Sequence, residues 1–137
     1  MKQRFNATAK DSRCYITFRI GHPDIDPVII NDGLLMTPTR SWKAGEPRKS
    51  PYGQALGGQY ERSYWYVRLQ GSAESFDLES QLMTFVQTLE PHAAVLDDLR
   101  RSGGEIELFV TLGGGTTLSY ACLRRLADLK IDLSIDF

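Results

Sequence analysis

One histidine and two aspartates stand within five residues near the start of the chain. They are His22, Asp24 and Asp26, and an imidazole beside carboxylates can form a metal corner or a general-base group. A metal site needs three or four converging ligands, but the other histidine, His92, is seventy residues away. We therefore expect Asp24 or Asp26 to cap a short helix, with His22 exposed to solvent, and we predict no metal site and no cofactor.

A run of three glycines between a predicted strand and a predicted helix is the second candidate. Backbone N–H groups in such a setting can bind phosphate. No Gly-Lys-Ser/Thr follows, as a Walker loop requires, and Leu118 stands where the dinucleotide fingerprint needs glycine. A flexible turn is the simpler interpretation, and an anion site is the alternative. The residues of that alternative are Gly113, Gly114 and Gly115 with Arg40 and Lys43.

Basic and aromatic side chains alternate in a stretch rich in proline and glycine, residues 36–63. We expect a long irregular loop here, in which Ser41-Trp42-Lys43 forms a short edge strand. Such a mixture can bind single-stranded nucleic acid or phosphate, but no nucleic-acid motif accompanies it. We therefore predict a solvated loop with Trp42 packed on the domain edge, and no nucleic-acid partner. The side chains in question are Arg40, Lys43, Arg48, Lys49, Arg62, Trp42, Tyr52 and Tyr60.

Four segments that alternate apolar and polar residues have the period of half-buried strands. They cover residues 14–20, 64–69, 105–112 and 131–137. A one-residue slip would expose every inward side chain, so we expect a firm register. The inward set is Cys14, Ile16, Phe18, Ile20, Trp65, Val67, Leu69, Ile106, Leu108, Val110, Leu112, Ile131, Leu133, Ile135 and Phe137.

Helical periodicity marks two longer regions. Residues 76–101 carry an apolar stripe interrupted by a proline, which predicts a kinked or paired helix. A second helix is expected from the N-cap Ser119 to about Leu129. A shorter helix is expected after Asp26, although residues 31–33 have the chemistry of a turn.

The predicted fold class is α+β with two layers. Each strand needs cover on one face only, which indicates a mixed, largely antiparallel sheet of four to five strands with helices on one face. A ferredoxin-like core with an additional helix is the nearest general description. A length of 137 residues, 42% of them hydrophobic and 24% charged, agrees with one globular domain over 1–137, with a flexible tail over 1–12.

Side chains on the outward side of these strands form the third candidate. Aromatic residues and arginines among carboxylates are typical of protein-binding hot spots. Two alternatives stay open: a solvated face held by Arg–carboxylate pairs, or a face covered by the long loop. We expect the partner-binding residues to be Tyr15, Arg19, Tyr64, Tyr66, Arg68, Glu107 and Phe109, with Glu105, Asp132 and Asp136 on the same side.

Charge is divided unevenly along the chain. The formal net charge is −1, so no overall electrostatic attraction to nucleic acid or acidic membranes is expected. Residues 1–70 nevertheless hold eleven Lys or Arg and six Asp or Glu, whereas residues 71–137 hold five and eleven. We expect a strongly dipolar molecule.

Neither cysteine nor the N-terminal segment indicates secretion. Cys14 and Cys122 lie far apart without a CxxC pattern, and we expect both to be buried, reduced thiols. The first thirteen residues lack the apolar run of a secretory signal, and no apolar run approaches the length of a membrane span. We expect a cytoplasmic protein with no membrane association.

Several short segments of the chain carry a family resemblance: Phe18-Arg19-Ile20, Ile25-Asp26-Pro27, Thr37-Pro38-Thr39-Arg40-Ser41-Trp42-Lys43-Ala44-Gly45, Leu89-Glu90-Pro91, Leu118-Ser119, Leu123-Arg124-Arg125-Leu126 and Leu133-Ser134-Ile135-Asp136-Phe137. Together they resemble one family, the bacterial domain of unknown function 4279. The resemblance covers nearly the whole chain and implies a small bacterial cytoplasmic α+β protein. No chemistry is assigned to the family, so no catalytic residue is carried over; similar small domains among the immunity proteins of toxin systems suggest an inhibitor role.

The main hypothesis is a non-enzymatic protein-interaction module. The similarity to immunity proteins suggests an inhibitor of the toxin-immunity type. It would bind a protein partner, or a second copy of itself, through the outward sheet face and the basic loop. The alternative is a small-ligand or phosphate-binding protein that uses the glycine turn with Arg40 and Lys43. A hydrolase that uses His22 and Asp24 is a third hypothesis.

Overall fold

The structure, a computed structural model, describes residues 15–70 and 77–136. Expectations for the tail 1–12, for Cys14 and for Phe137 lie outside these ranges. The strands are β1 (Tyr15–His22), β2 (Arg40–Trp42), β3 (Pro47–Lys49), β4 (Ala55–Gln59), β5 (Ser63–Gln70), β6 (Glu105–Thr111) and β7 (Asp132–Asp136). The helices are α2 (Pro27–Leu34), α3 (Leu78–Leu89), α4 (Ala93–Arg101) and α5 (Tyr120–Asp128), with a 3-10 turn, η1 (Glu90–His92), between α3 and α4. No helix in the described ranges is long and apolar enough to cross a bilayer.

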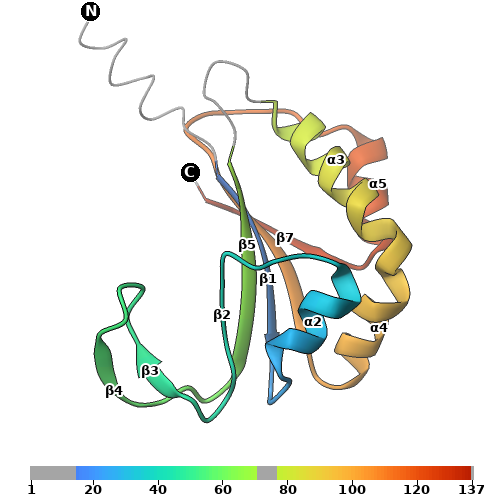
Figure 1. Ribbon diagram of the computed structural model, residues 1–137. Coiled ribbons are helices and arrows are strands. Elements are labelled where there is room, and N and C mark those ends of the chain that lie inside the picture. Colours follow the sequence, from blue (N-terminus) through green and yellow to red (C-terminus); the bar gives the residue numbers. More distant parts are fainter. Residues whose placement is uncertain (1–14, 71–76, 137) are drawn as a thin grey trace, which may run out of the picture.

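The four predicted strands form one sheet, and a short fifth strand completes it. The strand order is β2-β5-β1-β6-β7. Both neighbours of β1 are antiparallel to it, β2 is antiparallel to β5, and β7 runs parallel to β6 after the α5 crossover. Figure 1 shows the labelled helices together on one side of this sheet. The predicted two-layer α+β fold with a mixed sheet, consistent with a ferredoxin-like core, is confirmed.

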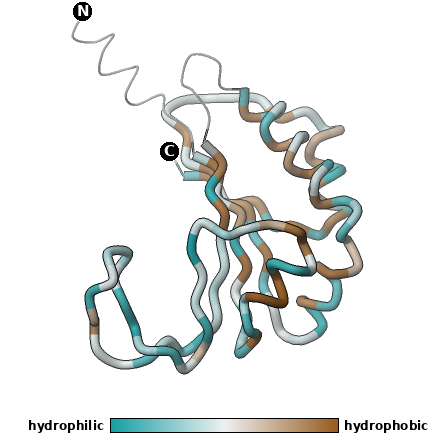
Figure 2. The backbone as a smooth tube through the Cα atoms, viewed as in Figure 1, coloured by the Kyte–Doolittle hydropathy of each residue, from teal (hydrophilic) through white to brown (hydrophobic). Residues whose placement is uncertain are grey.

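The hydrophobic core lies between the sheet and the helices. Phe18 of β1 and Trp65 of β5 are fully buried and meet edge to face, with ring centroids 6.1 Å apart. Phe85 of α3 packs on Phe18 at 5.0 Å. The indole Nε1 of Trp65 donates a hydrogen bond to Asn31 Oδ1 (2.7 Å), which ties α2 to the sheet. Figure 2 shows hydrophobic residues along the strands of the sheet and hydrophilic residues along β3.

The predicted helix starts are confirmed by their capping hydrogen bonds. Asp26 is extended, and its carboxylate accepts a hydrogen bond from the backbone N–H of Val28 (3.1 Å). Ser119 caps α5 in the same way, with its hydroxyl oxygen accepting from the N–H of Cys122 (3.2 Å). The predicted paired helix is also present, since η1 carries Pro91 between α3 and α4.

Residues 31–33 continue α2 instead of forming a turn. A Cβ atom at Gly33 would lie 2.9 Å from Cγ1 of Val95 in α4. Glycine is therefore used here for close packing of two helices, which outweighs its weak helix propensity. The helix ends at Leu35, which takes the left-handed conformation with a φ of 55°.

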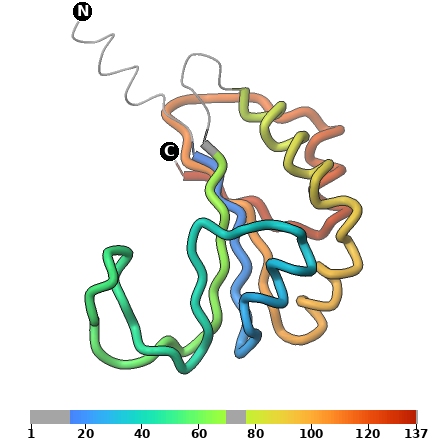
Figure 3. The backbone as a smooth tube through the Cα atoms, viewed as in Figure 1, coloured from blue at the N-terminus to red at the C-terminus, as the bar shows by residue number. Residues whose placement is uncertain are grey.

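The stretch 36–63, expected as an irregular loop, contains three short strands. The predicted edge strand is present as β2, one residue earlier than expected, but the hairpin of β3 and β4 was not predicted. Ser50 Oγ accepts hydrogen bonds from the N–H groups of Tyr52 (3.2 Å) and Gln54 (3.1 Å), and Gly53 has a φ of 86°, which closes the turn. The helix-breaking residues therefore build a hairpin, whose path between α2 and β5 can be followed in Figure 3.

The expectation that His22 is exposed to solvent is wrong. The side chain is 4% exposed at the end of β1. Its Nδ1 accepts hydrogen bonds from the N–H groups of Asp24 (3.1 Å) and Ile25 (3.0 Å), and its Nε2 lies 2.8 Å from Ser102 Oγ. The ring is buried because these three contacts satisfy both nitrogens. His22 therefore anchors the loop after β1 to the end of α4.

Candidate functional site

Cross-strand pairing places the predicted partner-binding residues on one face of the sheet. Paired residues point to the same side, and the helices lie on the other side (Figure 1). One row through all five strands consists of Arg40, Tyr66, Arg19, Glu107 and Asp132. We call this side the open face; its side chains are Arg40, Trp42, Tyr64, Tyr66, Arg68, Tyr15, Thr17, Arg19, Glu105, Glu107, Phe109, Thr111, Asp132, Ser134 and Asp136.

An aromatic cluster occupies the β2 and β5 part of the open face. Trp42 stacks on Tyr60 (centroids 4.4 Å apart) and on Tyr64 (4.9 Å). Tyr66 lies 5.7 Å from Tyr64 in a tilted arrangement, and the Arg40 guanidinium sits 5.0 Å from the Trp42 ring centre. The indole of Trp42 thus packs on side chains of the chain itself, at the edge of the sheet where its packing was predicted.

The β3–β4 hairpin is attached beside this cluster by hydrogen bonds to its backbone. The Tyr60 hydroxyl accepts from the N–H of Lys49 (3.0 Å) and donates to its carbonyl (3.0 Å). The guanidinium of Arg40 donates to the same carbonyl (2.5 Å) and to the Tyr60 hydroxyl (3.3 Å). Figure 1 shows the hairpin extending from the sheet on the side away from the helices. The hairpin therefore borders the open face.

An ion pair links the centre of the open face. Arg19 of β1 donates from Nε (2.8 Å) and Nη2 (2.6 Å) to Oε1 of Glu107 on β6, and Ser134 of β7 donates to the other carboxylate oxygen. The Arg19 guanidinium also lies 4.6 Å from the ring centre of Phe109. Partial burial alone would raise the pKa of Glu107, but these hydrogen bonds and the Arg19 charge outweigh it and hold the pKa below its usual value. Burial raises the pKa of Tyr64 nearby, an effect that Arg19 partly offsets.

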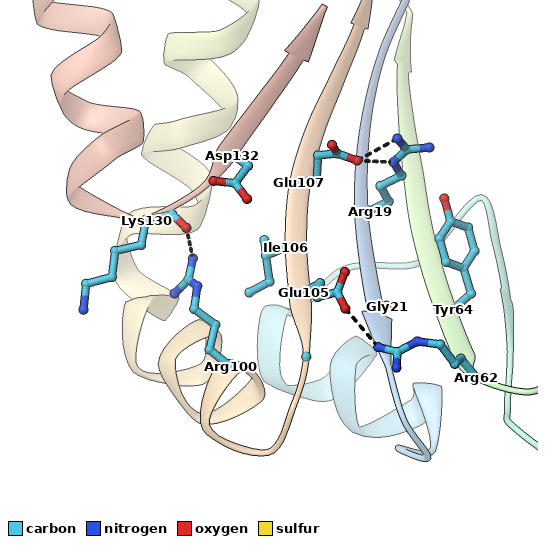
Figure 4. Close-up of a pocket in the computed structure, with 11 residues that line it drawn as sticks. Arg19, Gly21, Arg62, Tyr64, Arg100, Glu105, Ile106, Glu107, Lys130 and Asp132 are labelled. Atoms are coloured by element: carbon cyan, nitrogen blue, oxygen red, sulfur yellow. Dashed lines mark hydrogen bonds and ion pairs between the residues drawn. The ribbon is translucent and has the colours of Figure 1, made fainter.

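A hollow of about 550 Å³ opens where β1 ends and β6 begins, and Figure 4 shows its lining. Arg62 pairs there with Glu105 at 3.5 Å. Arg100 donates to the backbone carbonyls of Leu129 (2.5 Å) and Lys130 (2.8 Å). The size is that of a small-ligand site, but these arginines already have partners within the chain. In the described ranges no three His, Cys, Asp or Glu side chains gather to hold a metal ion.

The glycine turn and the basic residues suggested for an anion site are not brought together. Gly113, Gly114 and Gly115 form an exposed turn after β6, whereas Arg40 is in β2 and Lys43 just after it. β5 and β1 lie between those two strands, which separates them by about 14 Å across the sheet alone. The start of α5 is also occupied, because Glu79 accepts a hydrogen bond from the N–H of Ser119 (2.5 Å).

Cys122 is fully buried in the core as a free thiol. Burial raises its pKa, so the reactive thiolate is disfavoured. This agrees with the predicted buried, reduced thiol and separates Cys122 from the open face.

Comparison with known proteins identifies the family. The family model described as "Domain of unknown function (DUF4279)" matches residues 12–137. The chain belongs to the DUF4279 family. No curated protein and no solved structure gave a match. The resemblance stated from the sequence is thereby confirmed, and for this DUF4279 chain the arguments about function start from the open face.

Sequence reasoning missed two members of the aromatic cluster on this DUF4279 domain. Trp42 was predicted in a short edge strand and Tyr60 in the loop, both apart from Tyr64 and Tyr66. The alternation of Arg40 and Trp42 was the available signal, but three residues are too few to show which face of the sheet Trp42 occupies. Tyr60 joins the cluster only through the hairpin, which the sequence did not reveal.

Proposed function

We propose that this DUF4279 chain is a non-enzymatic interaction module that binds a protein partner through its open face. One observation carries the proposal: half-buried aromatic side chains and arginines run across a five-stranded sheet that no described helix covers on this side. Large aromatic rings and arginines dominate the binding energy of protein interfaces. The bacterial and cytoplasmic setting is a finer part of the same proposal and rests on the family resemblance. The sequence suggested two kinds of partner, a protein of the toxin-immunity type and a second copy of this chain.

The side chains of the open face are held in place before any partner arrives. Arg19 is fixed by Glu107 and Phe109, and Arg68 lies 6.0 Å from the Tyr66 ring centre. Side chains that are already ordered lose little conformational entropy on binding. Pre-organisation therefore favours recognition by this surface.

The remaining polar groups support binding over catalysis. The arginines and glutamates of the hollow pair with one another or with backbone carbonyls. His22 has both ring nitrogens engaged, and the Cys122 thiol is buried. None of these groups is poised as a free nucleophile or base.

The test compares Tyr66→Ala and Phe109→Ala with a matched control, Tyr120→Ala. Tyr120 is 84% exposed on α5, in the helical layer. Partners captured from native extract by the wild-type protein are identified by mass spectrometry, and their affinities are then measured by calorimetry. We expect Tyr66→Ala and Phe109→Ala each to lose about 2 kcal/mol or more, roughly 30-fold in Kd, while Tyr120→Ala binds normally. Equal affinities for all four proteins would overturn the proposal.

A further inference from the structure

The charges of the open face are divided by strand. The three cations belong to β2, β5 and β1, and the four carboxylates belong to β6 and β7. The first half of the sequence has a positive net charge and supplies the basic strands of the open face. The second half has a negative net charge and supplies the acidic strands. The cations are Arg40, Arg68 and Arg19, and the carboxylates are Glu105, Glu107, Asp132 and Asp136.

One cation and two carboxylates of these sets are exposed and lack a salt bridge within the described residues. Arg19 and Glu107 neutralise each other at the centre, beside the middle strand β1. Arg68 on one side and Asp132 and Asp136 on the other are exposed and make no salt bridge within residues 15–70 and 77–136. The hairpin that borders the basic side adds further exposed cations. These are Arg48 and Lys49.

This division makes the face complementary to itself. A two-fold axis that lies between two stacked sheets and runs parallel to the strands, midway between β1 and β6, places β5 of each copy over β7 of the other and β1 over β6. Each basic strand then meets an acidic strand. An axis across the strands would place like charges on each other. The strand order alone therefore selects one of the two symmetric ways to stack the faces.

We propose that the partner of the open face is a second copy of this chain, in a two-fold dimer whose axis runs parallel to the strands, between β1 and β6. This inference rests on the proposed function, because it takes the open face to be the binding surface. Arg68 of each copy lies over β7 of the other, level with Ser134 and therefore between Asp132 and Asp136. Arg19 lies over β6, and each basic hairpin lies beside the acidic β7 edge of its neighbour. The aromatic cluster and Phe109 supply the apolar contacts between the sheets.

The available area is that of a small specific interface. The four overlapping strands, about 4.8 Å apart and about seven residues long at 3.3 Å each, give a face of roughly 440 Å². Specific interfaces start at roughly 600 Å² per partner, so contacts between the hairpin and the β7 edge must supply the remainder. Such an interface is of moderate strength, and because its outer charges are exposed, it weakens as salt increases.

The test uses two charge reversals, Arg68→Glu and Asp132→Lys, and sedimentation velocity at concentrations up to about 100 µM. We expect the wild-type protein to form a dimer and each variant alone to be a monomer, because both symmetry-related contacts between positions 68 and 132 then join like charges. A 1:1 mixture of the two variants should dimerise. In that mixture the two substituted side chains face each other with opposite charges, and the native Arg68 of one copy faces the native Asp132 of the other. Asp136→Lys is the second variant for the acidic side, and circular dichroism confirms folding.

Arg124→Glu and Asp128→Lys are the matched controls. Both residues are exposed on α5 in the helical layer, so these variants should dimerise like the wild type. A monomeric wild type, a dimer that survives both open-face reversals, or a mixture that stays monomeric would each overturn the dimer. If the wild type is monomeric but captures another protein that Tyr66→Ala loses, the proposed function stands and the second copy is replaced by that protein. If alanine at Tyr66 and Phe109 changes no interaction, the proposed function fails as well.

Discussion

The two faces of the five-stranded sheet are built by the same strands with different side chains. On β5, Trp65 is buried under the helices, while its neighbours Tyr64 and Tyr66 lie half-buried on the open face. On β1, Phe18 packs on Phe85, while Arg19 spans to Glu107. Both faces are rich in aromatic rings, but only one is covered by helices. The comparison shows that side chains on the covered face stabilise the fold, whereas those on the open face are ordered without full burial and are available to a partner.

The largest expected effect is on the free energy of unfolding, which should fall far more for a substitution on the covered face than for one on the open face. Phe18→Ala should lower the free energy of unfolding by about 3–5 kcal/mol, because it leaves a cavity among Trp65 and Phe85. Tyr66→Ala, on the open face, should cost about 1 kcal/mol or less. Urea denaturation followed by circular dichroism measures both. Equal losses would show that the open face is part of the core.

Self-association, unlike stability, should depend more on the open face than on the covered face. Phe109→Ala should weaken self-association by about 30-fold or more while leaving most of the stability intact. Sedimentation equilibrium of the variant beside wild type gives the two dissociation constants. Tyr120→Ala serves as the control on the helical layer and should change neither quantity. A Phe109→Ala protein with wild-type self-association would remove the centre of the open face from the interface.

The hairpin should respond locally to a change at its attachment. Trp42→Ala removes two ring stacks, with Tyr60 and with Tyr64, each worth about 0.5–1.5 kcal/mol. Amide hydrogen exchange should become faster over 47–59, while α3 and α4 keep wild-type exchange rates. Uniform acceleration over the whole chain would mean that the hairpin and the sheet unfold as one unit.

The smallest expected effect is a pH dependence at the centre of the open face. The pKa of Glu107 is lowered in the folded protein, so its ion pair and hydrogen bonds stabilise the fold above the ordinary pKa of about 4.5. That contribution is lost as the pH falls through the lowered value. Glu107→Gln should therefore be less stable than wild type by about 1 kcal/mol or less at pH 7, and the difference should shrink below about pH 4. A difference that stays constant from pH 7 to pH 3 would contradict the assignment.

Much of this architecture could be predicted from local patterns. The alternation around Phe18 and Trp65 identified the strands and the covered face, and Asp26 and Ser119 identified two helix starts. These signals are local, because each depends on neighbours within one element.

The features that sequence reasoning missed depend on distant residues. His22 is buried because Ser102, eighty positions away, completes its hydrogen bonds. The hairpin pairs two short, fully exposed strands, so no apolar alternation marks it. The division of charge on the open face requires the strand order, which one sequence does not contain.

Hydroxyl-radical labelling of the wild-type protein, at about 1 µM and at about 100 µM, tests the central claim most directly. The open face is predicted to close against a second copy, so Tyr66 and Phe109 should become protected at the higher concentration, while Tyr120 on α5 is labelled equally at both. Equal labelling of Tyr66 and Phe109 at the two concentrations, or protection of Tyr120 instead, would contradict the account.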